Sequence, residues 1–104
     1  MSISTQAIGN TATTVYTSSG NSAVTYMTVT NFTGSAVAVD INLVPSGDSV
    51  GNVNLVADSL EIAANDTYQL YAGGEKLLLE NGDFISCTAN TAASLNAVIS
   101  YTSI

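Results

Sequence analysis

SLEIAANDTYQLYAGGEKLLLENGDFISCTA, residues 59–89, decides the fold because it contains one short pattern twice. The matching positions are Leu60, Ile62, Asp66 and Tyr68, which recur seventeen residues later as Leu77, Leu79, Asp83 and Ile85. Each copy has an apolar pair, a polar turn that ends in aspartate, and a new alternating run, which is typical of a strand end, a turn and the next strand. We expect two neighbouring turns of one β-sandwich, and a shared strand-and-turn pattern explains the copies better than an internal duplication does.

The side chains around these turns indicate which residues are buried. The two apolar residues of each copy lie two positions apart, so they point to one side of a strand and can pack against a facing sheet. In the second copy Asn81-Gly82 is a strong turn signal, because glycine adopts positive φ without steric cost. Both copies therefore predict a buried strand end that leads directly into a tight turn.

Alternating runs on either side of this stretch predict the remaining strands. The clearest one places Val37, Val39, Ile41 and Leu43 on a single apolar face, opposite a polar one. Further strands are expected at Val15 and Tyr16, at 23–31 with Met27 and Val29 inside and Tyr26 half covered, at Val53 to Val56, at 84–90 and at 95–101. Turns are expected at 18–21, 33–35, 45–51 and 72–75. The result is an all-β antiparallel β-sandwich, Ig-like or jelly-roll-like, with seven to nine short strands and no helix.

Length and composition fit one folded domain. The chain has 104 residues, of which 46% are hydrophobic and 9% charged, so it can bury a core and does not have the composition of a disordered chain. Residues 1–12 are small and polar with a break at Gly9-Asn10, so we expect an N-terminal arm that stays loose or lies along a neighbour. A single sandwich domain is then expected over residues 13–104.

The charge balance restricts the classes of partner. Eight acidic residues stand against one base, Lys76, with no histidine, which gives a formal net charge of −7. Nucleic-acid binding requires Lys and Arg against phosphates, and anionic membranes attract the same residues, so neither partner is expected. No run of eighteen apolar residues predicts a membrane-spanning helix. MSISTQAIGN has no basic start and no apolar core, so we expect no signal peptide and synthesis in a cytoplasm.

Few residues offer chemistry. The single cysteine, Cys87, alternates with Ile85 and Ala89, so we expect a buried small side chain rather than a reactive thiol, a disulfide or a zinc ligand. Ser-His and Cys-His catalysis is excluded by the missing histidine. Paired carboxylates remain open to a glycosidase, but the candidates are scattered: Asp40, Asp58, Glu61, Asp66 and Glu80. We expect no enzyme, and no catalytic, cofactor-binding or metal-ligating residue.

Three binding alternatives remain open. Calcium ligands could come from Asp48, from Asn65-Asp66 and from Asn81 with Asp83, although Asx turns explain all three sites without an ion. Sugar binding would need several exposed tyrosines to cluster, the candidates being Tyr16, Tyr26, Tyr68, Tyr71 and Tyr101. Asn31-Phe32-Thr33 and Asn65-Asp66-Thr67 match the glycosylation acceptor pattern, which is expected by chance in a chain so rich in Ser, Thr and Asn.

Four segments carry a resemblance to a known class of protein. They are TTVYT (13–17), AVAVDI (36–41), LEIAANDT (60–67) and LENGDFI (79–85). Over nearly its full length the chain resembles small β-sandwich structural proteins of tailed bacteriophage particles, and looks most like those of phages that infect cyanobacteria and other aquatic bacteria. The resemblance implies a non-enzymatic virion protein without catalytic residues.

Within that class the resemblance favours a capsid decoration or cement protein. Such a protein would be made in the host cytoplasm, bind the outside of the major capsid protein lattice in the virion, and form a small homo-oligomer, with a trimer favoured. Residues 2–10 and the loop 45–51 are the expected contacts, because sandwich edges are natural docking lines. A tail, neck or fibre component and a lectin-like glycan-binding module are the alternatives.

Overall fold

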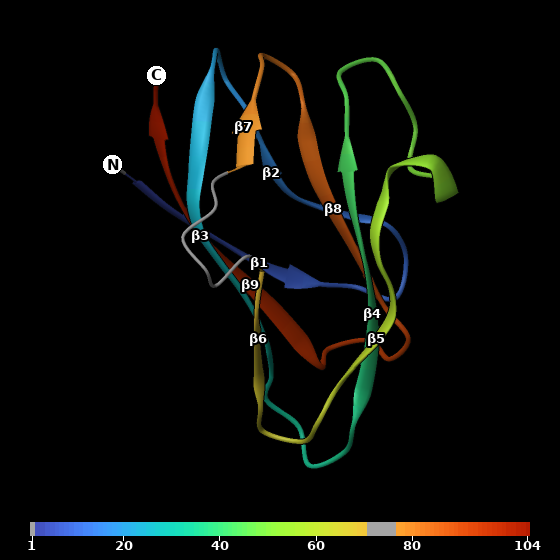
Figure 1. Ribbon diagram of the computed structural model, residues 1–104. Coiled ribbons are helices and arrows are strands. Elements are labelled where there is room, and N and C mark those ends of the chain that lie inside the picture. Colours follow the sequence, from blue (N-terminus) through green and yellow to red (C-terminus); the bar gives the residue numbers. More distant parts are fainter. Residues whose placement is uncertain (1, 71–76) are drawn as a thin grey trace.

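The computed structural model describes residues 2–70 and 77–104, which form two antiparallel sheets packed face to face (Figure 1). The larger sheet contains β1 (Ser2–Ile8), β9 (Leu95–Ser103), β3 (Ser22–Asn31), β6 (Thr67–Gln69) and β7 (Leu77–Leu79). The smaller sheet contains β2 (Thr13–Thr17), β8 (Phe84–Ala89), β4 (Val37–Val44) and β5 (Leu55–Ile62). The predicted all-β antiparallel sandwich is confirmed. The predicted turn at 72–75, Tyr71 and Lys76 lie outside the described residues.

The strands pair in a nested order. β1 pairs with β9, β2 with β8, β3 with β6 and β7, and β4 with β5, so the first strand meets the last and the middle strands meet each other. β6 and β7 follow one another along the same edge of β3 and together occupy one strand position. The chain is thus one long hairpin rolled into two sheets, with residues 45–54 at its tip. This is the order of a jelly roll, which decides between the two sandwich types expected from the sequence.

The N-terminal segment is a correction to the sequence prediction. Instead of a separate arm, Ser2–Ile8 forms β1, which pairs with β9 in an unbroken register from Ser2 opposite Tyr101 to Ile8 opposite Leu95. Ile8 is buried in the core. Strand pairing uses backbone groups, so a weakly patterned segment can fill the free side of β9. The sandwich therefore begins at residue 2 rather than at residue 13.

The repeated pattern forms two crossings between the sheets. The first copy leads from β5 in the smaller sheet to β6 in the larger one, and the second leads from β7 in the larger sheet back to β8. Both turns close in the same way: the N–H of Asp66 donates to the carbonyl of Ala63, and that of Asp83 to Glu80, each at 3.1 Å. The third residue has positive φ in both, 57° at Asn65 and 88° at Gly82, as in a type II turn. The predicted sequence of strand end, turn and next strand is confirmed.

The core consists of the inward faces of both sheets. The residues expected inside that are buried there include Val37, Val39, Ile41, Met27, Val29, Ile62, Leu79, Ile85, Cys87 and Ala89. Leu43 is only partly buried at the rim, and Tyr26 is half exposed as expected. The alternation of buried and exposed residues changes within β3. A register shift between Val24 and Tyr26 allows Val24 to face the core as Met27 and Val29 do.

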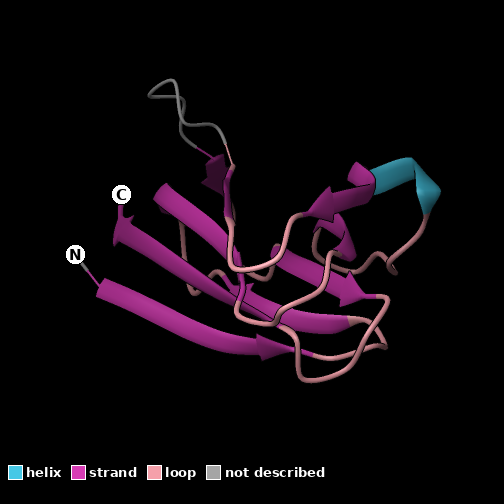
Figure 2. Ribbon diagram, turned by 90° about the horizontal axis from the view of Figure 1, so that it is seen from below, coloured by secondary structure: helices cyan, strands magenta, loops and turns pink. Residues whose placement is uncertain are grey.

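The tip of the long hairpin departs from the expected strand. Residues 52–54 form one 3₁₀ turn, η1 (Asn52–Asn54), and leave Val53 97% exposed instead of in a strand. Figure 2 shows this turn at the end of the molecule away from the termini. The tip folds back on the smaller sheet, because the Asn42 amide donates to the carbonyl of Gly51 and to Oδ1 of Asn54. Asn42 is therefore buried although it lies on the predicted polar face.

Candidate functional site

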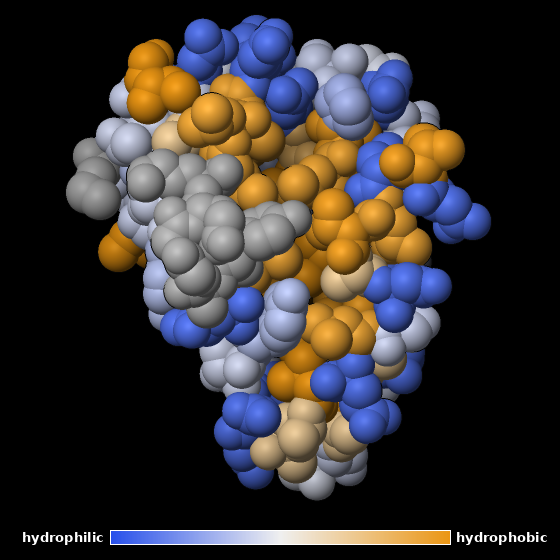
Figure 3. Space-filling view, in the orientation of Figure 1, coloured by the Kyte–Doolittle hydropathy of each residue, from blue (hydrophilic) through white to orange (hydrophobic). Residues whose placement is uncertain are grey.

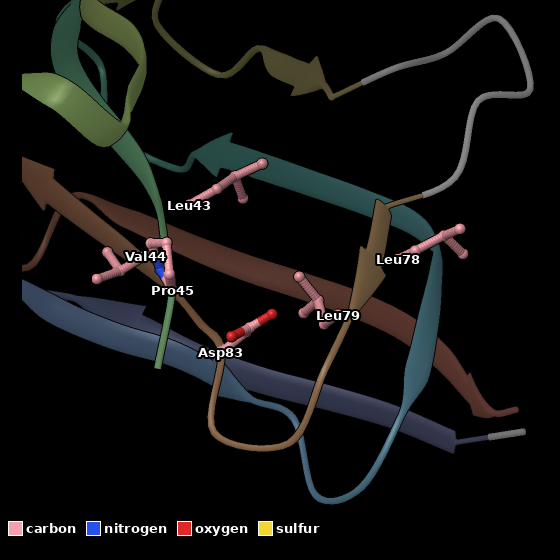
Figure 4. A pocket seen from close by; sticks show the side chains of 6 residues that line it. All are labelled: Leu43, Val44, Pro45, Leu78, Leu79 and Asp83. Atoms are coloured by element: carbon pink, nitrogen blue, oxygen red, sulfur yellow. The ribbon is translucent and has the colours of Figure 1, made fainter. Parts of the chain in front are cut away.

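A shallow pocket lies at the end of the sandwich where β4 leaves the smaller sheet and β7 leads into its turn. It has a volume of about 200 Å³ and is lined by Leu43, Val44, Pro45, Leu78, Leu79 and Asp83. Figure 4 shows the side chains of Leu79 and Asp83 pointing toward each other, whereas Leu78 points away. Leu78 is 69% exposed, so the apolar lining continues onto the outer surface.

Among the described residues, Asp83 is the only charged one in this pocket lining, and its oxygens already accept hydrogen bonds. Oδ1 accepts from the N–H of Ser46, and Oδ2 from the N–H of Glu80, both at 2.9 Å. Its backbone carbonyl accepts from Ser18 at 2.8 Å. The carboxylate therefore joins its own turn to the tip loop, and its place in the pocket is structural.

Asn81 and Gly82 complete this junction. Oδ1 of Asn81 accepts from the N–H of Gly20 at 2.8 Å, and the N–H of Gly82 donates to the carbonyl of Ser18 at 2.9 Å. A Cβ on Gly82 would lie 2.5 Å from Oγ of Ser46, so the loop packs directly on the turn. Three segments distant in sequence thus meet at one end of the sandwich.

The candidate calcium ligands are divided between the two ends. Asn81, Asp83 and the loop that carries Asp48 lie at one end, but the side-chain oxygens of Asn81 and Asp83 accept backbone N–H groups. Asn65 and Asp66 lie in the other turn, where Oδ1 of Asp66 accepts from the N–H of Thr67 at 2.8 Å. Within residues 2–70 and 77–104, no three His, Cys, Asp or Glu side chains gather at one point. Asn81, Asp83 and Asp66 therefore cap backbone N–H groups, but none of these bonds is the Asx turn expected from the sequence, because the donor is never the residue two positions on.

The candidate carboxylates are also dispersed. Asp40, Asp58 and Glu61 lie on β4 and β5, whereas Asp66 and Glu80 lie in the two turns. A second hollow of about 280 Å³ is lined by Asn10, Ala38, Asp40, Ser59, Thr88, Ala89 and Asn90. Asp40 is the single acid in that lining, and its Oδ1 accepts from the N–H of Ser59 at 2.7 Å. Within the described part of the chain, neither pocket has two carboxyl groups in its lining.

The tyrosines face different environments. Tyr16 is buried, and its hydroxyl donates to Oγ of Ser22 at 3.0 Å. The centroid of its ring lies 4.5 Å from that of the Tyr101 ring. Tyr68 packs against the core, and Tyr26 lies on the outer face of the larger sheet. The four tyrosines of the described ranges therefore do not form one surface platform for a sugar.

Asn31 has a structural role that the sequence analysis did not predict, because it noted this residue only in an acceptor pattern expected by chance. Its side chain is 0% exposed, and its amide donates to the carbonyls of Ser35 at 2.7 Å and Ile62 at 3.0 Å. Its Oδ1 accepts from the N–H and the hydroxyl of Thr33. The acceptor pattern at Asn31 therefore describes a buried anchor that cannot carry a glycan in the folded chain. The spacing of Asn31 could have indicated its burial, because it lies two residues after Val29 and continues the buried positions Met27 and Val29.

Cys87 is buried at the centre of the smaller sheet, as expected. Burial raises the pKa of its thiol to about 12, which removes the thiolate at neutral pH. Cys87 thus packs as a small apolar side chain.

Charged side chains are distributed unevenly between the two sheets. Figure 3 shows apolar side chains gathered on the face that bears β7, β4 and β5. The exposed apolar residues near the tip and on β7 are Val50, Val53, Val56 and Leu78. By contrast, the strands of the larger sheet contain no acid or base, and the acids of the described strands all lie on β4 and β5. The remaining described acids lie in loops and turns.

No helix in the described part of the chain has the length and apolar character required to cross a membrane. No protein-family model matches the sequence, and comparisons with curated proteins and with solved structures find no match to it.

Proposed function

We propose that this chain is a non-enzymatic structural protein of a bacteriophage virion, and that it binds the outside of the capsid as a decoration or cement protein. The observation that supports this most is the uneven distribution of charge, because the described strands of the larger sheet carry none, whereas β4 and β5 of the smaller sheet carry Asp40, Asp58 and Glu61. An uncharged sheet can approach another protein without desolvating charges, whereas the acids keep the exposed side soluble.

The fold also supports a mechanical role. Both ends of the sandwich are tied by side chains that bond to distant backbone groups, Asn31 at one end and Asp83 at the other. Such cross-links restrain the opening of the two sheets. A rigid domain that contacts neighbouring shell subunits through apolar and backbone contacts would oppose the internal pressure of packed DNA.

The proposed contacts with the major capsid protein are the N-terminal strand with residues 9–10 and the tip loop. Residues 45–50 are all exposed, and Ser2, Ile3 and residues 5–7 are exposed on β1. Apart from Ile8, these residues lie outside the core, so they can contact a partner without unfolding the sandwich.

The deciding experiment is the copy number of this chain in purified particles, measured by quantitative mass spectrometry against the major shell protein. A ratio near one to one, or a fixed fraction set by lattice symmetry, supports decoration. A few copies per particle would indicate a tail, neck or fibre component instead. Absence from the particles would overturn the virion proposal, and a glycan array with and without calcium would then test the lectin-like alternative.

A further inference from the structure

The two sheets have four edges, and one of them differs from the rest. β1 is seven residues long, has no charged residue and no proline, and pairs with β9 without a register shift. Among the described strands it pairs with β9 alone, and Figure 2 shows it at the outer border of its layer. Every second residue of such a strand directs its N–H and carbonyl away from the sheet.

The other three edges carry features that block strand addition. β2 has five residues and a register shift between Thr14 and Tyr16. β5 has two register shifts, the acids Asp58 and Glu61, and a φ of 50° at Ser59. β6 and β7 have three residues each. Short strands, bulges and charges are the usual protections of a sheet edge, and β1 has none of them.

We propose that β1 is the interface between two copies of this chain, which pair antiparallel across a two-fold axis and join their larger sheets into one continuous sheet. The charge distribution favours this edge over the others for contact between two copies. Each copy carries a formal charge of −7, so contacts through the acidic regions would be repulsive. The strands of the larger sheet carry no charge, and this edge can approach its own copy.

The sequence of β1 suits a two-fold axis at its centre, Thr5. With Thr5 opposite Thr5 of the second copy, Ile3 lies opposite Ala7, and Ser4 lies opposite Gln6. Ile3, Thr5 and Ala7 share the outer face of the sheet, because they pair with Ser100, Val98 and Asn96 on β9. Ile3 is 72% exposed in the single chain, and the pairing would place Ala7 of the second copy beside it and cover part of this side chain. Because each β1 is used once, the assembly closes as a dimer and differs from the trimer that the resemblance favours.

Strand pairing alone covers less area than the roughly 1,200 Å² of a stable complex, so we expect a dissociation constant of about 1–100 μM. Salt should strengthen the dimer, because it screens the repulsion between two acidic copies. Sedimentation equilibrium and native mass spectrometry of the full chain, from about 1 μM to 1 mM, would measure the mass and the constant.

A charge-reversal set tests the interface directly. Thr5→Lys places two like charges opposite each other and should weaken the dimer more than about tenfold, and Thr5→Glu should do the same. An equimolar mixture of the two variants should regain a dimer that contains one copy of each. Thr14→Lys makes the same substitution on β2, the protected edge of the other sheet, and should leave the dissociation constant unchanged.

The register has its own test. Ile3→Lys should weaken the dimer, and adding Ala7→Glu to the same chain should restore it, because residue 3 of one copy faces residue 7 of the other. Circular dichroism would confirm that each variant retains its strands. A chain that stays monomeric at about 1 mM, a trimer, or a dimer insensitive to the charge at residue 5 would overturn the proposal. These readouts use the isolated chain, so they are independent of its place in a virion. In the dimer the free edge of β1 is occupied, so a contact of residues 2–10 with the capsid would use the outer face of the strand.

Discussion

The turns at 63–66 and 80–83 share a sequence pattern and a backbone form, yet they are anchored differently. The first is held from outside, because Asn31 donates to the carbonyl of Ile62 and its backbone N–H donates to that of Asp66. The second is held by its own side chains, since Asp83 and Asn81 accept from Ser46 and Gly20. A local pattern therefore sets the conformation of a turn, whereas its attachment depends on segments that the pattern does not contain.

Removing the external anchor should have the largest effect. Asn31→Ala removes the donor to the buried carbonyl of Ile62 and to the partly buried carbonyl of Ser35, and it opens a small cavity, so we expect a loss of about 3 kcal/mol in the free energy of unfolding. Urea denaturation would measure it. Asn21→Ala, at an exposed asparagine, should change stability by less than about 0.5 kcal/mol and serves as the control. Equal losses in both variants would refute the anchor role.

The third position of each turn offers the next contrast. Gly82→Ala combines positive φ with a Cβ placed 2.5 Å from Oγ of Ser46, so we expect a loss of about 2 kcal/mol. Asn65→Ala at the equivalent position meets only the backbone strain and should cost about 1 kcal/mol. Thermal unfolding of both variants compares them directly. Adding Ser46→Gly should recover part of the stability lost in Gly82→Ala and none of that lost in Asn65→Ala. A larger loss in Asn65→Ala would contradict the contact between loop and turn.

The strands that follow the two turns differ in their response to pH. The second turn leads to Cys87, whose pKa burial raises from 9.0 to about 12, whereas β6 after the first turn contains no thiol. A raised folded-state pKa gives a contribution that is complete below pH 9 and is lost as the pH rises toward 12. Relative to Cys87→Ala, the natural chain should therefore lose about 1.4 kcal/mol by pH 10. Urea unfolding at pH 7, 9 and 10 would show this, and parallel curves for the two chains would exclude the thiol as the cause.

The aspartates give the smallest contrast. Asp83→Ala removes the acceptors of two backbone N–H groups and should cost about 1 kcal/mol. Asp66→Ala removes one bond, to the N–H of the next residue, and should cost about 0.3 kcal/mol. Chemical denaturation of the pair at equal ionic strength would resolve the difference. Equal costs would mean that the tip loop does not depend on Asp83.

The turns of the repeated stretch and the buried faces of the strands could be predicted from the sequence, because both depend on residues that are close together in the chain. The period of two placed Val37, Val39 and Ile41 inside, and Asn81-Gly82 located its turn. β1 was missed, because its pairing relies on backbone groups and on a free side of β9 that only the assembled sheet provides. The anchoring role of Asn31 was also missed, because its partners at Ser35 and Ile62 become neighbours only after folding. Strand order is likewise a property of the whole chain, so the sequence left two sandwich types open.

The nested pairing also determines when the protein can fold. β4 and β5 are adjacent in sequence and can form a hairpin early, but β1 and β3 both flank β9 and must wait for Leu95–Ser103 to be synthesised. Contacts between the two ends of a chain are slow to form, because loop closure costs entropy before the contacts repay it. During translation β1 is therefore exposed on both sides, with no charge to discourage aggregation. The edge proposed for the dimer is then also the segment most in need of protection before the last strand arrives.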